Sequence, residues 1–116
     1  MHEASPSSAE VRFIYREQVL SDLRRAASQA RSAQPEIVKV LLFGSLVQGH
    51  WTADSDADLI VVVRKDFAAF WDRSQYQIYT KLIPTDTLVY SQTEFEELAR
   101  DPTSFLAENL QTAVEL

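Results

Sequence analysis

The most constraining feature of this sequence is an apolar run that ends directly in a glycine and a serine. Residues 37–43 (IVKVLLF) are interrupted only by Lys39, which is typical of a buried strand. Gly44 follows at once, and a glycine lets the backbone turn sharply and approach a ligand with no Cβ in the way. Ser45 stands at the expected start of a short helix, where its hydroxyl, an amide N–H and the positive end of the helix dipole suit a phosphate group. We therefore predict a phosphate-binding turn after this strand.

Two aspartates lead into a second apolar run. Asp56 and Asp58 open residues 56–63, which are predicted to form a strand. Because residues two apart on a strand point to the same face, both carboxylates should converge beside the Gly44-Ser45 turn. Hard oxygen ligands of this kind suit Mg²⁺. Two such ions would activate an attacking oxygen and neutralise a leaving one, so both aspartates are predicted metal ligands and catalytic residues.

A third carboxylate would complete this arrangement, and Asp86 is the best candidate. It opens the short, β-rich segment 86–90 after Pro84 and shares a strand face with Leu88 and Tyr90. It would bind the metal nearest the acceptor and take the acceptor's proton as general base. The alternative interpretation is a turn residue after the proline. Asp54 is interpreted as a residue that solvates the loop.

The remaining patterns are mostly helical. We predict helices over roughly 8–33, after a capping box at Ser7, and over roughly 67–81, although residues 76–80 are also compatible with a strand. A second capping box, Thr93-x-x-Glu96, predicts another helix, and Asp101-Pro102 predicts a last one whose apolar side reaches Val114. This order of elements predicts an α/β (or α+β) fold, with a small mixed sheet of about three strands flanked by helices.

Composition limits the classes of protein that remain. The 116 residues suit one domain spanning 1–116, with 1–7 as a flexible N-terminus. Cysteine is absent, which excludes disulfides and thiolate zinc sites. The net charge of −6 argues against general binding to nucleic acid. No apolar run is long enough for a membrane span, and there is no signal peptide, so we predict a cytoplasmic protein.

Taken together, the motif residues resemble a known family. They are similar to the signature of the minimal nucleotidyltransferases, within the polymerase-β-like superfamily, at Gly44, Ser45, Gly49, Ser55, Asp56, Asp58 and Leu59. The resemblance implies the nucleotidyltransferase fold. It also implies that Gly49 and Ser55 join Gly44 and Ser45 in binding the nucleotide and its phosphates.

The resemblance further implies an activity and a partner. Members transfer a nucleoside monophosphate, usually AMP from ATP, to an acceptor hydroxyl with release of pyrophosphate, and Mg²⁺, here two ions, is the expected cofactor. Small members are often paired with a helical RNase-type toxin called HEPN. They act as its antitoxin, in some cases by adenylylating a tyrosine of the toxin. The apolar faces of the first and last helices would permit a homo- or hetero-oligomer.

The sequence departs from the family pattern in the loop after Ser45. Family members commonly carry an arginine where this chain has Gln48, and Val47, His50 and Trp51 make the loop more apolar. Trp51 could stack on a base, contact a partner or be partly buried over the core. These departures support an alternative hypothesis, in which the chain is a weakly catalytic or non-catalytic binding module that neutralises a toxin by covering it.

Overall fold

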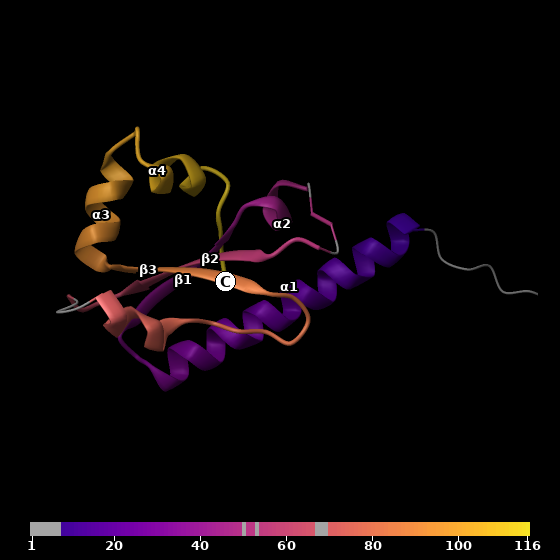
Figure 1. Cartoon of the computed structure of the whole chain (residues 1–116), viewed down its shortest axis with the longest axis horizontal. Helices are drawn as coiled ribbons and strands as arrows, with labels where there is room; N and C mark the ends of the chain where they lie inside the picture. Colours follow the sequence, from indigo (N-terminus) through magenta and orange to yellow (C-terminus); the bar gives the residue numbers. More distant parts are fainter. Residues whose placement is uncertain (1–7, 50, 53, 67–69) are drawn as a thin grey trace, which may run out of the picture.

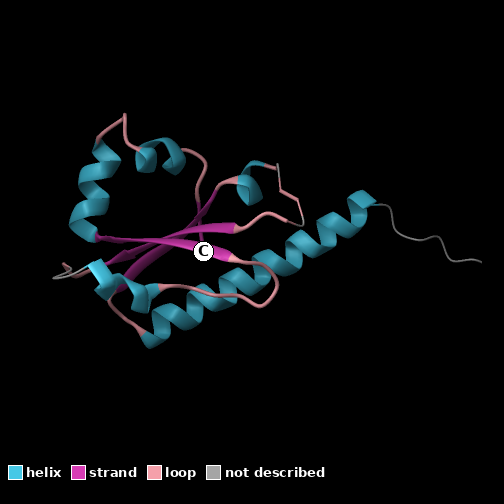
Figure 2. Ribbon diagram, viewed as in Figure 1, coloured by secondary structure: helices cyan, strands magenta, loops and turns pink. Residues whose placement is uncertain are grey.

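The computed structural model describes residues 8–49, 51–52, 54–66 and 70–116, and among these it describes the side chains of all but residues 8–14 and 70–71. In this part of the chain, a four-stranded sheet has the long helix α1 on one face and α3 and α4 on the other (Figures 1 and 2). The elements are, in order, α1 (Ser8–Ala33), β1 (Ile37–Phe43), α2 (Ser45–Gln48), β2 (Ala57–Val63), η1 (Phe70–Tyr76), β3 (Thr85–Ser91), α3 (Gln92–Arg100), α4 (Phe105–Leu110) and β4 (Val114–Glu115). The expected mixed sheet flanked by helices is confirmed. No helix of the described residues is both long and apolar enough to cross a bilayer.

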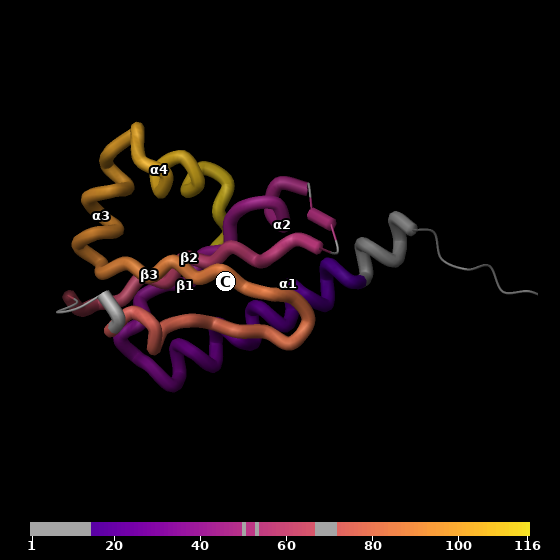
Figure 3. The backbone as a smooth tube through the Cα atoms, viewed as in Figure 1, coloured from indigo at the N-terminus to yellow at the C-terminus, as the bar shows by residue number. Residues whose placement is uncertain are grey.

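The sheet brings the predicted motif residues to one of its ends. The strand order is β3-β2-β1-β4, with β1 antiparallel to β2 and β2 parallel to β3. The end of β1 and the starts of β2 and β3 therefore lie together, beside α2, as the backbone trace shows (Figure 3). The fourth strand is the one addition to the expected sheet, because Val114 and Glu115 return to pair with Leu42 and Leu41 of β1.

The central strands are buried on both faces of the sheet, which explains why β1 and β2 are apolar except at Lys39 and Asp58. Alternate residues of β2 pack toward α1 (Ala57, Leu59, Val61 and Val63) or toward α3 and α4 (Ile60 and Val62). Val19 and Leu23 of α1 complete the first core, and Leu106 of α4 is buried in the second. The sheet is thus held rigid from two sides at its centre.

The helix expected over 67–81 is wrong in extent. The described part of this segment is a short 3₁₀ helix, η1, that ends at Tyr76, and the residues after it run in an extended path beside β3. Ile78 N–H donates to Thr87 Oγ1 at 3.3 Å, and Thr85 Oγ1 donates to Ile78 O at 2.5 Å. These bonds to β3 replace those that a longer helix would make. Phe67 and its two successors lie outside the described residues.

The starts of the last two helices also differ from the predicted ones. The capping box of α3 is formed by Ser91 and Glu94, two residues before the predicted pair. In α4 the N-cap is Ser104, whereas Asp101 forms a local turn with Thr103. The helix ends at Leu110, so Val114 is not part of it. Ser7, the predicted cap of α1, and the segment 1–7 that was expected to be flexible lie outside the described residues.

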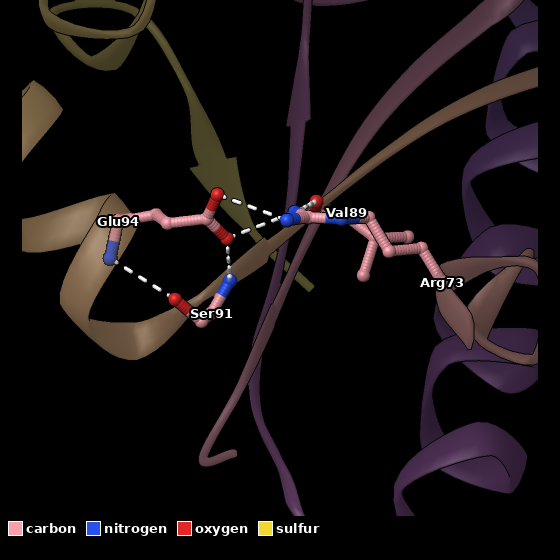
Figure 4. Close-up of polar contacts among 4 residues, drawn as sticks. All are labelled: Arg73, Val89, Ser91 and Glu94. Atoms are coloured by element: carbon pink, nitrogen blue, oxygen red, sulfur yellow. Dashed lines mark hydrogen bonds and ion pairs between the residues drawn. The ribbon is translucent and has the colours of Figure 1, made fainter. Parts of the chain in front are cut away.

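The capping box of α3 is tied to η1 by a single arginine (Figure 4). Arg73 donates to both carboxylate oxygens of Glu94, at 2.8 and 2.9 Å, and to Val89 O of β3 at 2.7 Å. Glu94 Oε1 also accepts the Ser91 N–H at 2.9 Å. The hydrogen bonds from Arg73, followed by those from Ser91, hold the pKa of Glu94 below its ordinary value. One carboxylate therefore joins three elements of the fold.

We expect Glu94→Gln to lower the free energy of unfolding by about 1 kcal/mol at pH 7, less than a buried hydrogen bond to a charged group contributes, because the side chain is partly solvated. A lowered pKa means that this contribution is complete above the pKa of the unfolded chain and is lost as the pH falls through the folded value. Urea unfolding of both proteins at pH 7 and in acid should therefore show the difference shrink in acid. Glu97→Gln, at an exposed position of the same helix, is the control. An equal loss for both variants would contradict the prediction.

Candidate active site

Asp58 lies against the turn at Gly44. It is the second residue of β2 and the cross-strand partner of Phe43, the last residue of β1. A Cβ placed on Gly44 would overlap Asp58 Oδ2 and lie 3.3 Å from Asp58 Cγ. Gly44 also has φ 83° and ψ −152°, a conformation that is open almost only to glycine. The backbone conformation therefore requires glycine here, and the facing carboxylate leaves room for a Cβ only if the Asp58 side chain moves.

Ser45 begins α2, as the sequence predicts. Gly44 is the N-cap, and its carbonyl accepts the N–H groups of Val47 and Gln48 at 3.1 and 3.0 Å. Within the described part of the chain, no side chain caps this helix start. Leu46 is fully buried and anchors the helix to the core on the α1 side. The turn is thus fixed in position, with its first amides at the end of the sheet where Asp58 lies.

Gly49 and Ser55 shape the loop that joins α2 to β2. Gly49 ends α2 in the left-handed conformation, with φ 83° and ψ 6°, and a Cβ there would meet nothing within 4 Å. Ser55 Oγ accepts the Thr52 N–H at 3.1 Å, which closes the turn just before β2. Both residues therefore have a local structural role in the described chain, and their contact with a nucleotide stays a prediction.

Three carboxylates share one electrostatic neighbourhood at this end of the sheet. Asp86 is the register partner of Asp58 across β2 and β3, and Asp56 comes directly before β2. Burial, then the charge of Asp86, then that of Asp56 raise the pKa of Asp58 above its ordinary value. Asp58 is half-buried, whereas Asp56 and Asp86 are exposed. The predicted third acid therefore stands next to the predicted pair.

The donor types fit a magnesium ion, although the side chains are not gathered around a common point. Among the described residues, no three acidic or histidine side chains are placed to hold a metal ion together. Asp56, Asp58 and Asp86 also form no ion pair with a lysine or arginine of the described part of the chain. Mg²⁺ commonly takes only one or two carboxylates, with water and substrate phosphates as its other ligands. A pair such as Asp56 and Asp58 meets that requirement in the chemistry of its oxygens.

We expect Asp58→Asn to stabilise the protein in the absence of divalent ions. Burial and the like charges of Asp86 and Asp56 both disfavour the Asp58 carboxylate. The amide removes that charge, so we expect a gain on the order of a cross-strand pair, roughly 0.2–1 kcal/mol. The sign follows from the raised pKa of Asp58, since the folded state keeps this proton to higher pH than the unfolded chain and loses stability as the pH rises through that range. Urea unfolding at pH 7 in a chelator tests this. A less stable Asp58→Asn variant would contradict it, and Asp54→Asn is the matched control.

Sequence reasoning missed the cation that holds α2. Arg16 of α1 donates from Nε and Nη2 to Leu46 O, at 3.1 and 2.7 Å. The two residues are 30 positions apart in the sequence, and no local pattern signals such a contact.

Among the loop residues after Ser45, Trp51 is buried and packs on Tyr15, with ring centroids 5.4 Å apart. This agrees with the predicted alternative in which Trp51 lies over the core. Gln48 is exposed at the end of α2, and His50 lies outside the described residues.

A mixed sheet covered by helices, with a Gly-Ser turn facing aspartates at one end, is the arrangement of a nucleotidyltransferase domain. The profile of the nucleotidyltransferase domain family matches residues 20–111, and the chain belongs to this family. Such domains act on nucleoside triphosphates and generally use divalent metal ions. No match was found among curated proteins.

One solved structure supports the same fold. A crystal structure from Sulfolobus solfataricus, of a protein provisionally assigned as a nucleotidyltransferase, aligns with a TM-score of 0.60 and 20% identity. The alignment covers 83% of this chain and 85% of the other. At this identity the likeness shows the fold, and the predicted nucleotidyltransferase fold is confirmed.

Proposed function

We propose that this chain transfers AMP from ATP to a hydroxyl group of a partner protein. Gly44 and Ser45 hold the β and γ phosphates, with Gly49 and Ser55 shaping the nucleotide loop. The family supports the class of reaction, nucleotidyl transfer, whereas the choice of AMP and of a protein acceptor rests on the resemblance to minimal nucleotidyltransferases.

The observation that carries the proposal is the contact between Asp58 and the Gly44 turn. A carboxylate this close to a phosphate-binding turn would repel a triphosphate unless a divalent cation lay between them. Asp56 and Asp58 would hold that cation, and Mg²⁺ would supply the charge that offsets the phosphates and the developing negative oxygen. Asp86, which pairs with Asp58 across β2 and β3, would accept the acceptor's proton.

The partner we propose is a HEPN-type helical toxin, with this chain as its antitoxin in the cytoplasm. The minimal members that the motif resembles are paired in this way. Such a pairing gives the single domain, residues 1–116, an acceptor that is brought by the partner.

The test is transfer of label from ATP to the purified partner. A purified helical protein of the HEPN type, taken from the neighbouring reading frame where one is present, would be incubated with this chain, Mg²⁺ and ATP labelled in the α-phosphate. We expect label on the partner, release of pyrophosphate and a mass increase of one AMP unit. ATP labelled in the γ-phosphate is the control and should leave the partner unlabelled. Labelling by the γ-phosphate instead would identify a phosphoryl transferase.

A second candidate is a binding module that neutralises the partner without turnover. Gln48 supports it, because an exposed amide stands where the family commonly has an arginine near the phosphates. Calorimetric titration with ATP and Mg²⁺ separates the two candidates. Absence of nucleotide binding together with a stable complex would favour the module, whereas binding with pyrophosphate release would favour the enzyme.

A further inference from the structure

Phe105 is an exposed aromatic side chain that the fold does not need as core. It is 55% exposed, although it is the first residue of α4, whose next residue, Leu106, is buried. Among the described side chains, the other large apolar ones that are exposed are Tyr79, Leu82 and Val114. Of these four residues, Phe105 is the one with a ring that packs on Phe43, the last residue of β1 before the Gly44 turn.

The backbone that carries this ring is held in a fixed position, and the ring itself packs against Phe43. Ser104 caps α4 by accepting the Ala107 N–H at 3.0 Å, and its hydroxyl donates to Leu98 O of α3 at 2.6 Å. Leu106, at 1% exposure, anchors the helix in the core between α4 and the sheet. An exposed ring that is fixed in this way loses little conformational freedom when a flat ligand stacks on it.

The ring also lies on the face of the sheet that carries the aspartates. Phe105 meets Phe43 edge to face, with ring centroids 5.7 Å apart and planes at 79°. Phe43 comes directly before Gly44 and pairs across the strands with Asp58. Asp58 is two residues before Ile60, which belongs to the same core as Phe43 and Leu106. An exposed aromatic ring therefore packs on the residue that comes directly before the phosphate-binding turn.

We propose that Phe105 is the surface on which the base of the bound nucleotide stacks. This inference rests on the proposed function, since it needs a triphosphate at Gly44 and Asp58. Every base has a π-face, so stacking on this ring contributes affinity with little selection among bases. Phe105 would then bind the end of the nucleotide that the aspartates and the Gly-Ser turn do not reach.

The experiment compares two ligands, one with a base and one without. Calorimetric titrations in Mg²⁺ would use ATP and inorganic tripolyphosphate with the wild type, Phe105→Ala, Phe105→Trp and Tyr79→Ala, the last being the matched loss of a remote exposed ring. We expect Phe105→Ala to weaken ATP binding on the order of tenfold and to leave tripolyphosphate binding unchanged. Phe105→Trp should restore ATP binding, and Tyr79→Ala should bind as the wild type does.

Each of the remaining outcomes would contradict either the stacking role of Phe105 or the proposed function as a whole. Unchanged ATP affinity in Phe105→Ala, or an equal loss for both ligands, would overturn the stacking role alone. Wild type that binds ATP no better than tripolyphosphate would do the same. Wild type that binds neither ligand would overturn the proposed function together with this inference. A loss of partner binding only, with ATP affinity intact, would assign Phe105 to the partner surface instead.

Discussion

The double variant Asp56→Asn, Asp58→Asn is expected to transfer AMP at least about a thousandfold more slowly than the wild type. Charge stabilisation by a catalytic metal is worth several kcal/mol, and each 1.4 kcal/mol is a factor of ten in rate. Because residues that act as a unit are not additive, each single variant should lose nearly as much as the double variant. Single-turnover label transfer at saturating Mg²⁺ measures all three.

Two controls separate loss of chemistry from loss of fold. Asp54→Asn removes an exposed aspartate two residues before Asp56 and should keep wild-type transfer. Mg²⁺ with ATP should raise the melting temperature of the wild type, because a ligand that binds only the folded state stabilises it, and should not raise that of the double variant. Transfer by the double variant at a rate near that of the wild type would refute the assignment of both aspartates.

The two central strands were predictable because a strand that is buried on both faces has a nearly continuous run of apolar residues. Residues 37–43 form β1 as predicted, and β2 begins one residue after its predicted start. Helices cover both faces of these central strands, so nearly every position is apolar. The turn at Gly44 was predictable for a related reason, since a glycine that ends a buried strand has few other uses.

The elements that were mispredicted depend on contacts distant in sequence or on competing local signals. Residues 91–96 offer two overlapping Ser/Thr-x-x-Glu frames, and the first is used because Arg73 also binds Glu94. β4 consists of two residues and exists because β1 presents an open edge to it. The apolar spacing after residue 67 is helical, but the chain leaves the helix after Tyr76 and forms hydrogen bonds with β3 instead. Local propensity carries no information on any of these partners.

The residues of the candidate site also fall into two groups, those that a local motif predicted and those whose contacts join distant segments. Spacing within residues 44–58 predicted Gly44, Asp56 and Asp58 as site residues, and their roles stay predictions. The contacts of Arg16 with Leu46 and of Phe105 with Phe43 join segments that only the folded chain brings together. Sequence reasoning thus supplied the groups that would do chemistry, whereas the groups that would position the turn or the base required coordinates.

Gly44→Ala and Gly49→Ala form a matched pair with sharply different expected results. Both glycines have φ near 83°. Gly49 is left-handed, where an alanine pays about 1–2 kcal/mol, whereas ψ −152° places Gly44 in a region that is open almost only to glycine and costs more. Only at Gly44 does the new Cβ also overlap a side chain, that of Asp58, while at Gly49 it meets nothing within 4 Å. We expect Gly44→Ala to be the less stable variant by urea unfolding and to lose transfer, whereas Gly49→Ala should lose less stability.

A double-mutant cycle locates the cause of the larger loss. If the Cβ of Gly44→Ala collides with the carboxylate, its cost should fall by about 1 kcal/mol or more when Asp58 is first replaced by alanine, because neighbouring residues that share a contact are not additive. The cost of Gly49→Ala should be the same in both backgrounds. Equal costs for Gly44→Ala with and without the Asp58 side chain would show that the turn and the carboxylate do not touch, and the shared phosphate and metal site would then lose its structural basis.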